Sequence, residues 1–69
     1  MDRKFVIEVA QRANEEACSL LVEMIVQIAG GDAEAASSTL RSLRLRMDII
    51  EAQLALLMLD ELQPENIPE

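Results

Sequence analysis

Two rows of apolar residues run along the second half of this chain at alternating spacings of four and three residues. The first row is Leu40, Leu43, Met47, Ile50, Leu54 and Leu57, and the second is Leu45, Ile49, Ala52, Leu56 and Leu59. At about 100° per residue, the rows lie roughly 170° apart on one helix. One row can pack on the preceding helix of the same chain, and the other then needs another molecule. The pattern therefore predicts an obligate partner. We expect a second copy of the chain, with the second row as the dimer interface.

The shortness of the chain supports the same expectation. A chain of 69 residues makes at most one domain and buries a small core, so its stability on its own is marginal. Chains of this size usually add disulfides, a bound metal or oligomerisation. The sequence has one cysteine, Cys18, and no histidine, which excludes an intrachain disulfide and disfavours a zinc site. Oligomerisation remains.

The first half of the chain also has the periodicity of a packed helix, over about residues 2–29. Its main apolar row is Val6, Ala10, Ala13, Ala17, Leu20, Met24 and Ile28. A weaker row, which we expect to be half-buried, is Ile7, Gln11, Asn14, Cys18, Leu21 and Ile25. Within it, Asn14 either fixes the register of a packed seam, as buried asparagines do in coiled coils, or faces water.

Gly30, Gly31 and Asp32 are the one strong interruption of the periodicity. A glycine just past a helix end accepts the left-handed conformation that closes the last turn, and Asp32 can then cap the next helix. Ser37 or Ser38 is a competing cap that would lengthen the connection. Because Pro64 disfavours helical geometry at the residue before it, we expect the second helix to end by residue 63.

These elements together predict an all-α fold. We expect one domain over residues 1–63, with helices at about 2–29 and 33–63 and a turn at 30–32, followed by a mobile acidic tail over 64–69. The architecture is a two-helix antiparallel hairpin that homodimerises into a four-helix bundle.

The charge of the chain restricts its partners. Thirteen acidic residues against six basic ones give a net charge of −7, which repels nucleic acid and anionic membrane and favours basic proteins. We therefore expect no nucleic-acid or membrane partner. No targeting segment and no apolar run of membrane-spanning length are visible, so a cytoplasmic location, in a bacterial host cell, is expected.

Catalysis is poorly supported by the residue types present. The chain lacks histidine, tyrosine and tryptophan, and its serines have no histidine base. Glu15 and Glu16 lie near Cys18, whereas a reactive thiol needs an electropositive setting. Carboxylate metal sites in helix bundles also rely on histidine. We expect a protein that is not an enzyme and binds no metal or cofactor.

Three of the six basic residues, Arg41, Arg44 and Arg46, fall within six positions of one another. Arginine is enriched among the residues that dominate interface energetics, so this cluster is the candidate partner-binding site. A structural role is the competing interpretation. In that case Arg44 pairs with Asp48 four residues on, and Arg46 lays its aliphatic stem over the core.

In its length, its Gly30-Gly31-Asp32 turn, its two apolar rows and its arginine cluster, the chain resembles the small phage-encoded anti-quorum-sensing inhibitors. These are helix-hairpin homodimers that block host regulators. The resemblance implies binding and inhibition, by occlusion, of a LuxR-type quorum-sensing transcription regulator with a basic DNA-binding domain. It also implies a possible second target, a type IV pilus assembly ATPase.

Two other classes of protein stay open as alternatives. Type III secretion needle co-chaperones are also short helical hairpins, with a similar plan of turn, long helix and apolar finish from Gly30 to Leu62. A co-chaperone should be unstable without its partner. Plasmid-type RNA-binding hairpin dimers share the four-helix architecture and an acidic tail, although the net charge opposes RNA binding, which should fall steeply with salt.

Overall fold

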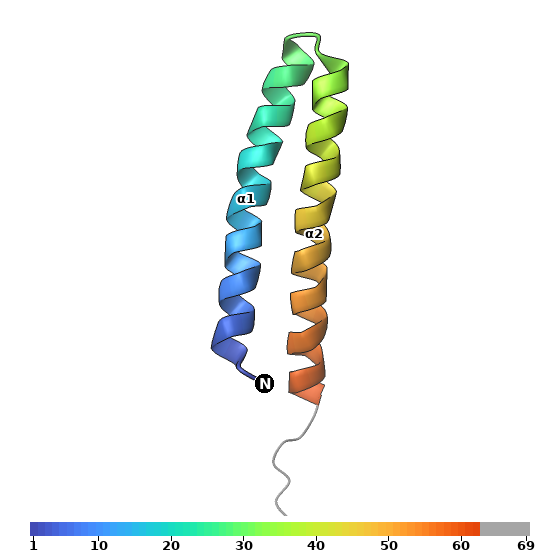
Figure 1. The fold of residues 1–69 in the computed structure, drawn as a ribbon. Helices are drawn as coiled ribbons and strands as arrows, with labels where there is room; N and C mark the ends of the chain where they lie inside the picture. The colour runs from blue at the N-terminus through green and yellow to red at the C-terminus, as the bar shows by residue number, and fades with distance from the viewer. Residues whose placement is uncertain (63–69) are drawn as a thin grey trace, which may run out of the picture.

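The computed structural model describes residues 1–62, and every regular element in this range is helical. Helix α1 runs Arg3–Ala29 and helix α2 runs Ala33–Leu62. The helices lie side by side in opposite directions and are joined at one end, which confirms the predicted all-α hairpin (Figure 1). The tail expected at 64–69 lies outside the described residues.

Aspartates start both helices. The Asp2 carboxylate accepts a hydrogen bond from the Phe5 N–H at 3.2 Å, and the Asp32 carboxylate accepts one from the Ala35 N–H at 3.1 Å. Each carboxylate satisfies an amide of the first turn that has no partner within its helix. Asp32 is therefore the cap of α2, and the competing serine caps are not used.

The turn between the helices contains a glycine in the left-handed conformation. Gly31 has a φ of 79°, which a residue with a Cβ adopts only at a cost. Its N–H donates to the Ile28 carbonyl at 3.0 Å, and the Asp32 N–H donates to the Gln27 carbonyl at 2.9 Å. These two bonds satisfy carbonyls at the end of α1 and form a Schellman motif. The chain can therefore reverse direction within Gly30, Gly31 and Asp32.

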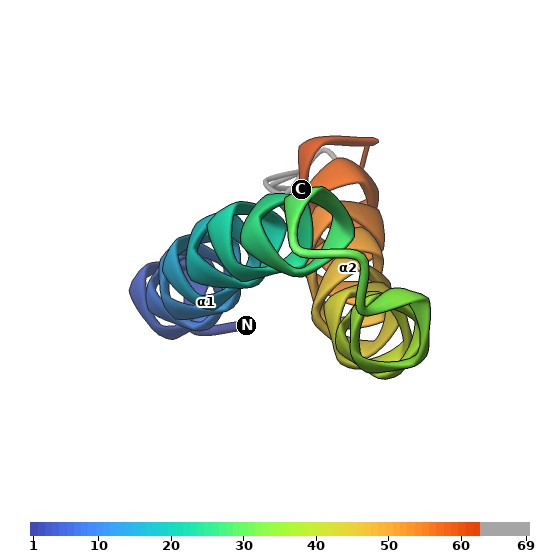
Figure 2. The same ribbon diagram turned by 90° about the horizontal axis from the view of Figure 1, so that it is seen from above.

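Small side chains dominate the seam between the helices. Its buried members are Val6, Ala13 and Ala17 from α1 and Ala36, Thr39 and Leu43 from α2. The main row predicted on α1 is buried or partly buried, except for Ile28 beside the turn. Seen along the hairpin from the turn, the two helices are inclined to each other, as in ridge-into-groove packing (Figure 2).

The first apolar row predicted on α2 divides into two columns with a seven-residue spacing. Leu43, Ile50 and Leu57 are buried or partly buried against α1. Met47 and Leu54 are 55% and 51% exposed. Because a strict four-three row spans two columns, the helix can turn only one of them fully into a two-helix seam.

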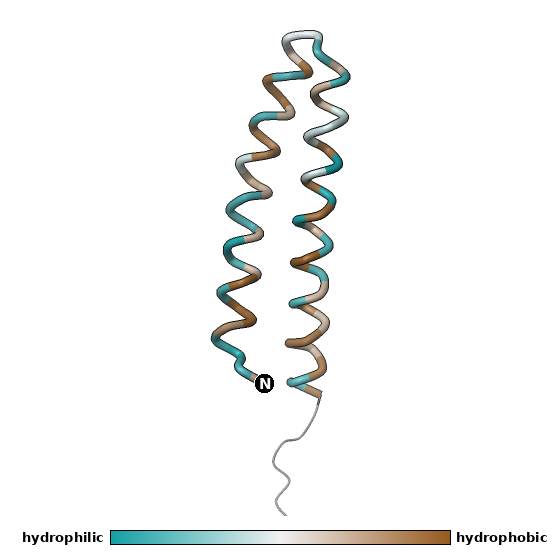
Figure 3. The backbone as a smooth tube through the Cα atoms, in the orientation of Figure 1, coloured by the Kyte–Doolittle hydropathy of each residue, from teal (hydrophilic) through white to brown (hydrophobic). Residues whose placement is uncertain are grey.

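The weaker row expected to be half-buried on α1 is exposed to different degrees within the single chain. Ile7 and Leu21 are 37% and 44% exposed, as expected of a half-buried row, whereas Ile25 is 63% exposed and Asn14 and Cys18 also lie at the surface. Figure 3 accordingly shows hydrophobic residues along both helices, including the part of α1 next to the turn. One hairpin leaves much of its apolar surface uncovered.

Candidate functional site

A polar column of α2 lies along its contact with α1. It consists of Thr39, Arg46, Gln53 and Asp60, which follow one another every seven residues. Thr39 is buried, and Arg46 and Gln53 are partly buried. Seven-residue spacing keeps these positions on the same edge of the helix, so the column runs its whole length.

Three members of the polar column bind side chains of α1. The Thr39 hydroxyl donates to Gln27 Oε1 at 2.7 Å, and Arg46 Nε donates to Glu16 Oε1 at 2.7 Å. Gln27 is held in turn by the Glu23 carboxylate, to which its amide donates at 3.3 Å. These contacts set the alignment of the two helices near the turn and at their middle.

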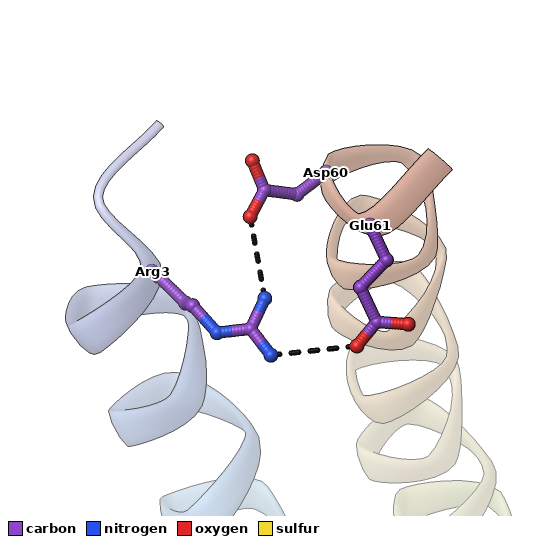
Figure 4. A network of polar contacts seen from close by, with 3 residues as sticks. All are labelled: Arg3, Asp60 and Glu61. Carbon is purple, nitrogen blue, oxygen red and sulfur yellow. Dashed lines mark hydrogen bonds and ion pairs between the residues drawn. The ribbon is translucent and has the colours of Figure 1, made fainter. Parts of the chain in front are cut away.

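The third contact closes the open end of the hairpin. The two terminal nitrogens of Arg3 reach Asp60 Oδ2 at 3.2 Å and Glu61 Oε2 at 3.4 Å (Figure 4). All three side chains are substantially exposed to water, so this ion pair is worth at most about 1 kcal/mol. Its position joins the start of α1 to the end of α2.

The predicted arginine cluster is divided by the structure. Arg46 belongs to the polar column, paired with Glu16, and its side chain is about one-third exposed. Arg41 and Arg44 are exposed and make no ion pair within residues 1–62; the pair expected between Arg44 and Asp48 is not formed there. Two of the three arginines are therefore free to meet a partner, and they do not share one patch with Arg46.

The row predicted as the dimer interface lies on the surface of α2. Its members Leu45, Ile49, Ala52, Leu56 and Leu59 are all exposed. Ile49 also reaches a shallow hollow of α1 that is lined by Phe5, Glu8, Val9, Arg12, Ala13 and Glu16. The side of the hairpin that carries this hollow is named the pocket face. Glu8, Arg12 and Glu16 make its α1 half strongly charged.

The opposite side of the hairpin, named the heptad face, is more apolar. Ile49 of α2 and Val9 of α1 line the same hollow on the pocket face. The edge of each helix on the far side of the seam from these residues therefore belongs to the opposite face of the hairpin. These edges carry Ile7, Asn14, Leu21 and Ile28 from α1 and Leu40, Met47 and Leu54 from α2. All except the partly buried Leu40 are exposed. Arg44, Asp48 and Glu51 lie beside Met47 and Leu54 at its margin, around a second shallow hollow.

Sequence reasoning found the residues of the heptad face but not their grouping. The sequence pattern assigns Ile7 and Leu21 to the weaker row of the first helix, and Met47 and Leu54 to the first row of the second helix. The seven-residue spacing within each helix is the signal that predicts this grouping. It is found at Ile7, Asn14 and Leu21 in the first helix and at Leu40, Met47 and Leu54 in the second.

Cys18 is a free, exposed thiol. Within residues 1–62, no three acidic or cysteine side chains are grouped so that they could hold a metal ion. Neither helix, over the same residues, offers a stretch long and apolar enough to span a bilayer.

Comparisons were made with protein-family models, with curated proteins and with solved structures. None of the three finds a match to this chain. The candidate site therefore rests on the geometry of the hairpin and the chemistry of its surface.

Proposed function

We propose that this chain is a non-enzymatic interaction module that self-associates into a four-helix bundle. One observation carries the proposal: small side chains fill the seam, while most of the large apolar side chains lie outside it. Leu43 is the only leucine among the buried residues of the range 1–62, whereas Leu21, Leu45, Leu54, Leu56 and Leu59 are exposed. Contiguous exposed apolar surface of this kind marks interaction sites. A second copy of the chain is the partner that is always present.

We further propose that the dimer binds and inhibits a basic bacterial protein. The net charge of −7 would steer the bundle toward a positively charged surface, such as the DNA-binding domain of a LuxR-type regulator. Binding there would occlude DNA without any catalysis. A type IV pilus assembly ATPase is a second target of the same kind of inhibition, suggested by the resemblance of the chain to phage-encoded inhibitors.

The test is a competition assay with a purified LuxR-type regulator and a fluorescent operator fragment. Increasing amounts of the chain should release the operator and lower its fluorescence anisotropy, with one dimer bound per regulator at saturation. Because charge steering is screened by salt, the association rate should fall as salt is raised. Full operator binding in a large excess of the dimer, for each regulator tried, would reject this target.

Variants of the arginines make that assay more specific. Arg41→Ala with Arg44→Ala removes the two exposed guanidinium groups of the arginine cluster and leaves the Glu16–Arg46 pair intact. If the exposed arginines grip the regulator, this double variant should lose inhibition while its helix content is unchanged, at a chain concentration where sedimentation shows that it is still a dimer. Arg46→Ala is the matched control, because its effect should be on the hairpin and not on the regulator. Equal inhibition by all three chains would give the arginines a structural role only.

The co-chaperone alternative is separated by the behaviour of the pure chain. A co-chaperone should be poorly folded alone and gain helix only when its helical partner is added. The polar contacts across the seam support a hairpin that forms by itself. Circular dichroism and sedimentation of the isolated chain decide between the two, since a folded homodimer would exclude the co-chaperone reading.

A further inference from the structure

The heptad face has an internal symmetry. Ile7 and Leu21 each lie seven positions from Asn14, and Leu40 and Leu54 each lie seven positions from Met47. Because Glu16 pairs with Arg46, Asn14 of α1 and Met47 of α2 stand at nearly the same level along the antiparallel hairpin. Both columns are therefore symmetric about one level, near the middle of the molecule.

We propose that a second copy of this chain packs on the heptad face with its turn at the opposite end of the bundle. This inference rests on the self-association in the proposed function and specifies its surface and orientation. A two-fold axis at the level of Asn14 and Met47 then brings Ile7 against Leu21 of the second copy, and Leu40 against Leu54. Each apolar layer repeats on the other side of the axis, as an isologous interface requires.

Asn14 favours this orientation over the one with both turns at the same end. With the turns at the same end, α1 would stack on α2 of the second copy, and Asn14 would face Met47, which cannot satisfy its amide. With the turns at opposite ends, the two Asn14 side chains meet near the axis. An amide is both donor and acceptor, so the pair can satisfy each other and fix the register.

Arg44 and Glu51, two of the three charges at the margin, agree with the same axis, and the third is Asp48. Arg44 precedes Met47 by three positions and Glu51 follows it by four, both at the margin of the heptad face. The axis therefore places Arg44 of each copy at the level of Glu51 of the other, within about 1.5 Å along the helix. Two opposite-charge pairs result. With the turns at the same end, Arg44 would instead stand at the level of Cys18.

The pocket face is a poorer surface for a second copy. There the exposed leucines of α2 adjoin an α1 edge that carries Glu8, Arg12 and Glu16. Packing this side against itself would desolvate several charges without apolar layers from both helices. The heptad face carries no charge between its two columns except at the ends. The row Leu45, Ile49, Ala52, Leu56 and Leu59 is then left for a different protein.

A matched pair of charge insertions tests the choice of face. Leu54→Glu places a carboxylate on the heptad face, at a position that is 51% exposed in the single chain. Leu56→Glu places one on the pocket face of the same helix, at a position that is 42% exposed. In sedimentation equilibrium, Leu54→Glu should weaken dimerisation by at least about a hundredfold, because its carboxylate is buried against Leu40 of the second copy. Leu56→Glu should dimerise as the unchanged chain does. The reverse order would overturn the inference.

Disulfide formation tests the orientation and does not depend on a destabilised variant. In a Cys18→Ser background, Met47→Cys places a thiol beside the axis and should give a crosslinked dimer under mild oxidation. Ala52→Cys is the matched control, since it lies at the centre of the row predicted from sequence and should stay uncrosslinked. Crosslinking at 52 alone, or none at 47 in a chain that sediments as a dimer, would overturn the inference.

A charge swap tests the register. Arg44→Glu alone should weaken the dimer, and adding Glu51→Arg should restore it, since the exchanged pair meets again across the axis. No rescue would contradict the register. These outcomes also separate the two proposals. A chain that is monomeric at all concentrations defeats self-association itself, whereas a dimer that depends on Leu56 and crosslinks at 52 defeats only the choice of face.

Discussion

Two columns of α2 that are neighbours in sequence have opposite environments. The polar column lies against α1, with Thr39 buried and Arg46 partly buried, whereas the apolar column of the heptad face is 55% exposed at Met47 and 51% exposed at Leu54. Each residue of the first is followed directly by one of the second: Thr39 by Leu40, Arg46 by Met47 and Gln53 by Leu54.

The difference shows what selects the face of a helix that packs inside a hairpin. Hydrophobicity alone would turn Met47 and Leu54 inward. Instead, α1 offers polar partners, Gln27 and Glu16, at the levels of Thr39 and Arg46. Specific hydrogen bonds between the helices set their alignment, and the more apolar column is left on the surface. Exposed apolar residues beside a satisfied polar seam favour a second packing surface.

The largest expected effect comes from the apolar side of the seam. Leu43→Ala should lower the free energy of unfolding by about 2–5 kcal/mol, because Leu43 is 5% exposed and its removal leaves a cavity. Leu45→Ala is the matched control, with the same atoms removed from a site that is 59% exposed. Urea denaturation at one chain concentration measures both. Equal losses would show that the row containing Leu45 is as deeply buried in the assembled protein as the seam.

Enlarging the seam should separate the helices. Ala17→Leu adds a branched side chain where the native alanine is buried, and overpacking of this kind costs about 1–3 kcal/mol. Ala52→Leu makes the same change at an exposed position of α2 and should leave stability nearly unchanged. The midpoint of thermal unfolding compares the two variants. A harmless Ala17→Leu would mean that the helices are not held closely at this level.

The sequence predicts those parts of the fold that depend on local signals. Gly31 and Asp32 act on neighbouring backbone atoms, so the turn could be located from residue types, whereas the choice of Asp32 over Ser37 or Ser38 as the cap of α2 needed the structure. The buried alanines of α1 followed from periodicity. Partial burial of Arg46 was one of the two interpretations of the arginine cluster, but its pairing with Glu16 could not be predicted, because that residue belongs to the other helix. Pairing between distant residues is not contained in the pattern of either helix.

A smaller effect is expected at the buried end of the polar column. Thr39→Val keeps the shape of the side chain and removes the hydroxyl that donates to Gln27 Oε1. The lost hydrogen bond should cost about 1 kcal/mol. Thr39→Val combined with Gln27→Met removes both partners and should recover part of that loss, as measured by urea denaturation. A double variant whose loss of stability equals the sum of the losses of the two singles would show that the two residues act separately.

The smallest effect is expected where the polar column meets water. Glu16 and Arg46 are joined at 2.7 Å, but their side chains are 49% and 34% exposed, so solvent screens the pair. A double-mutant cycle of Glu16→Gln and Arg46→Gln should give a coupling energy of about 0.2–1 kcal/mol. The coupling should shrink in about 1 M salt, where the screening length falls to about 3 Å. A coupling that is large and insensitive to salt would mean that the assembled protein covers this pair, and a partner would then have to occupy the pocket face.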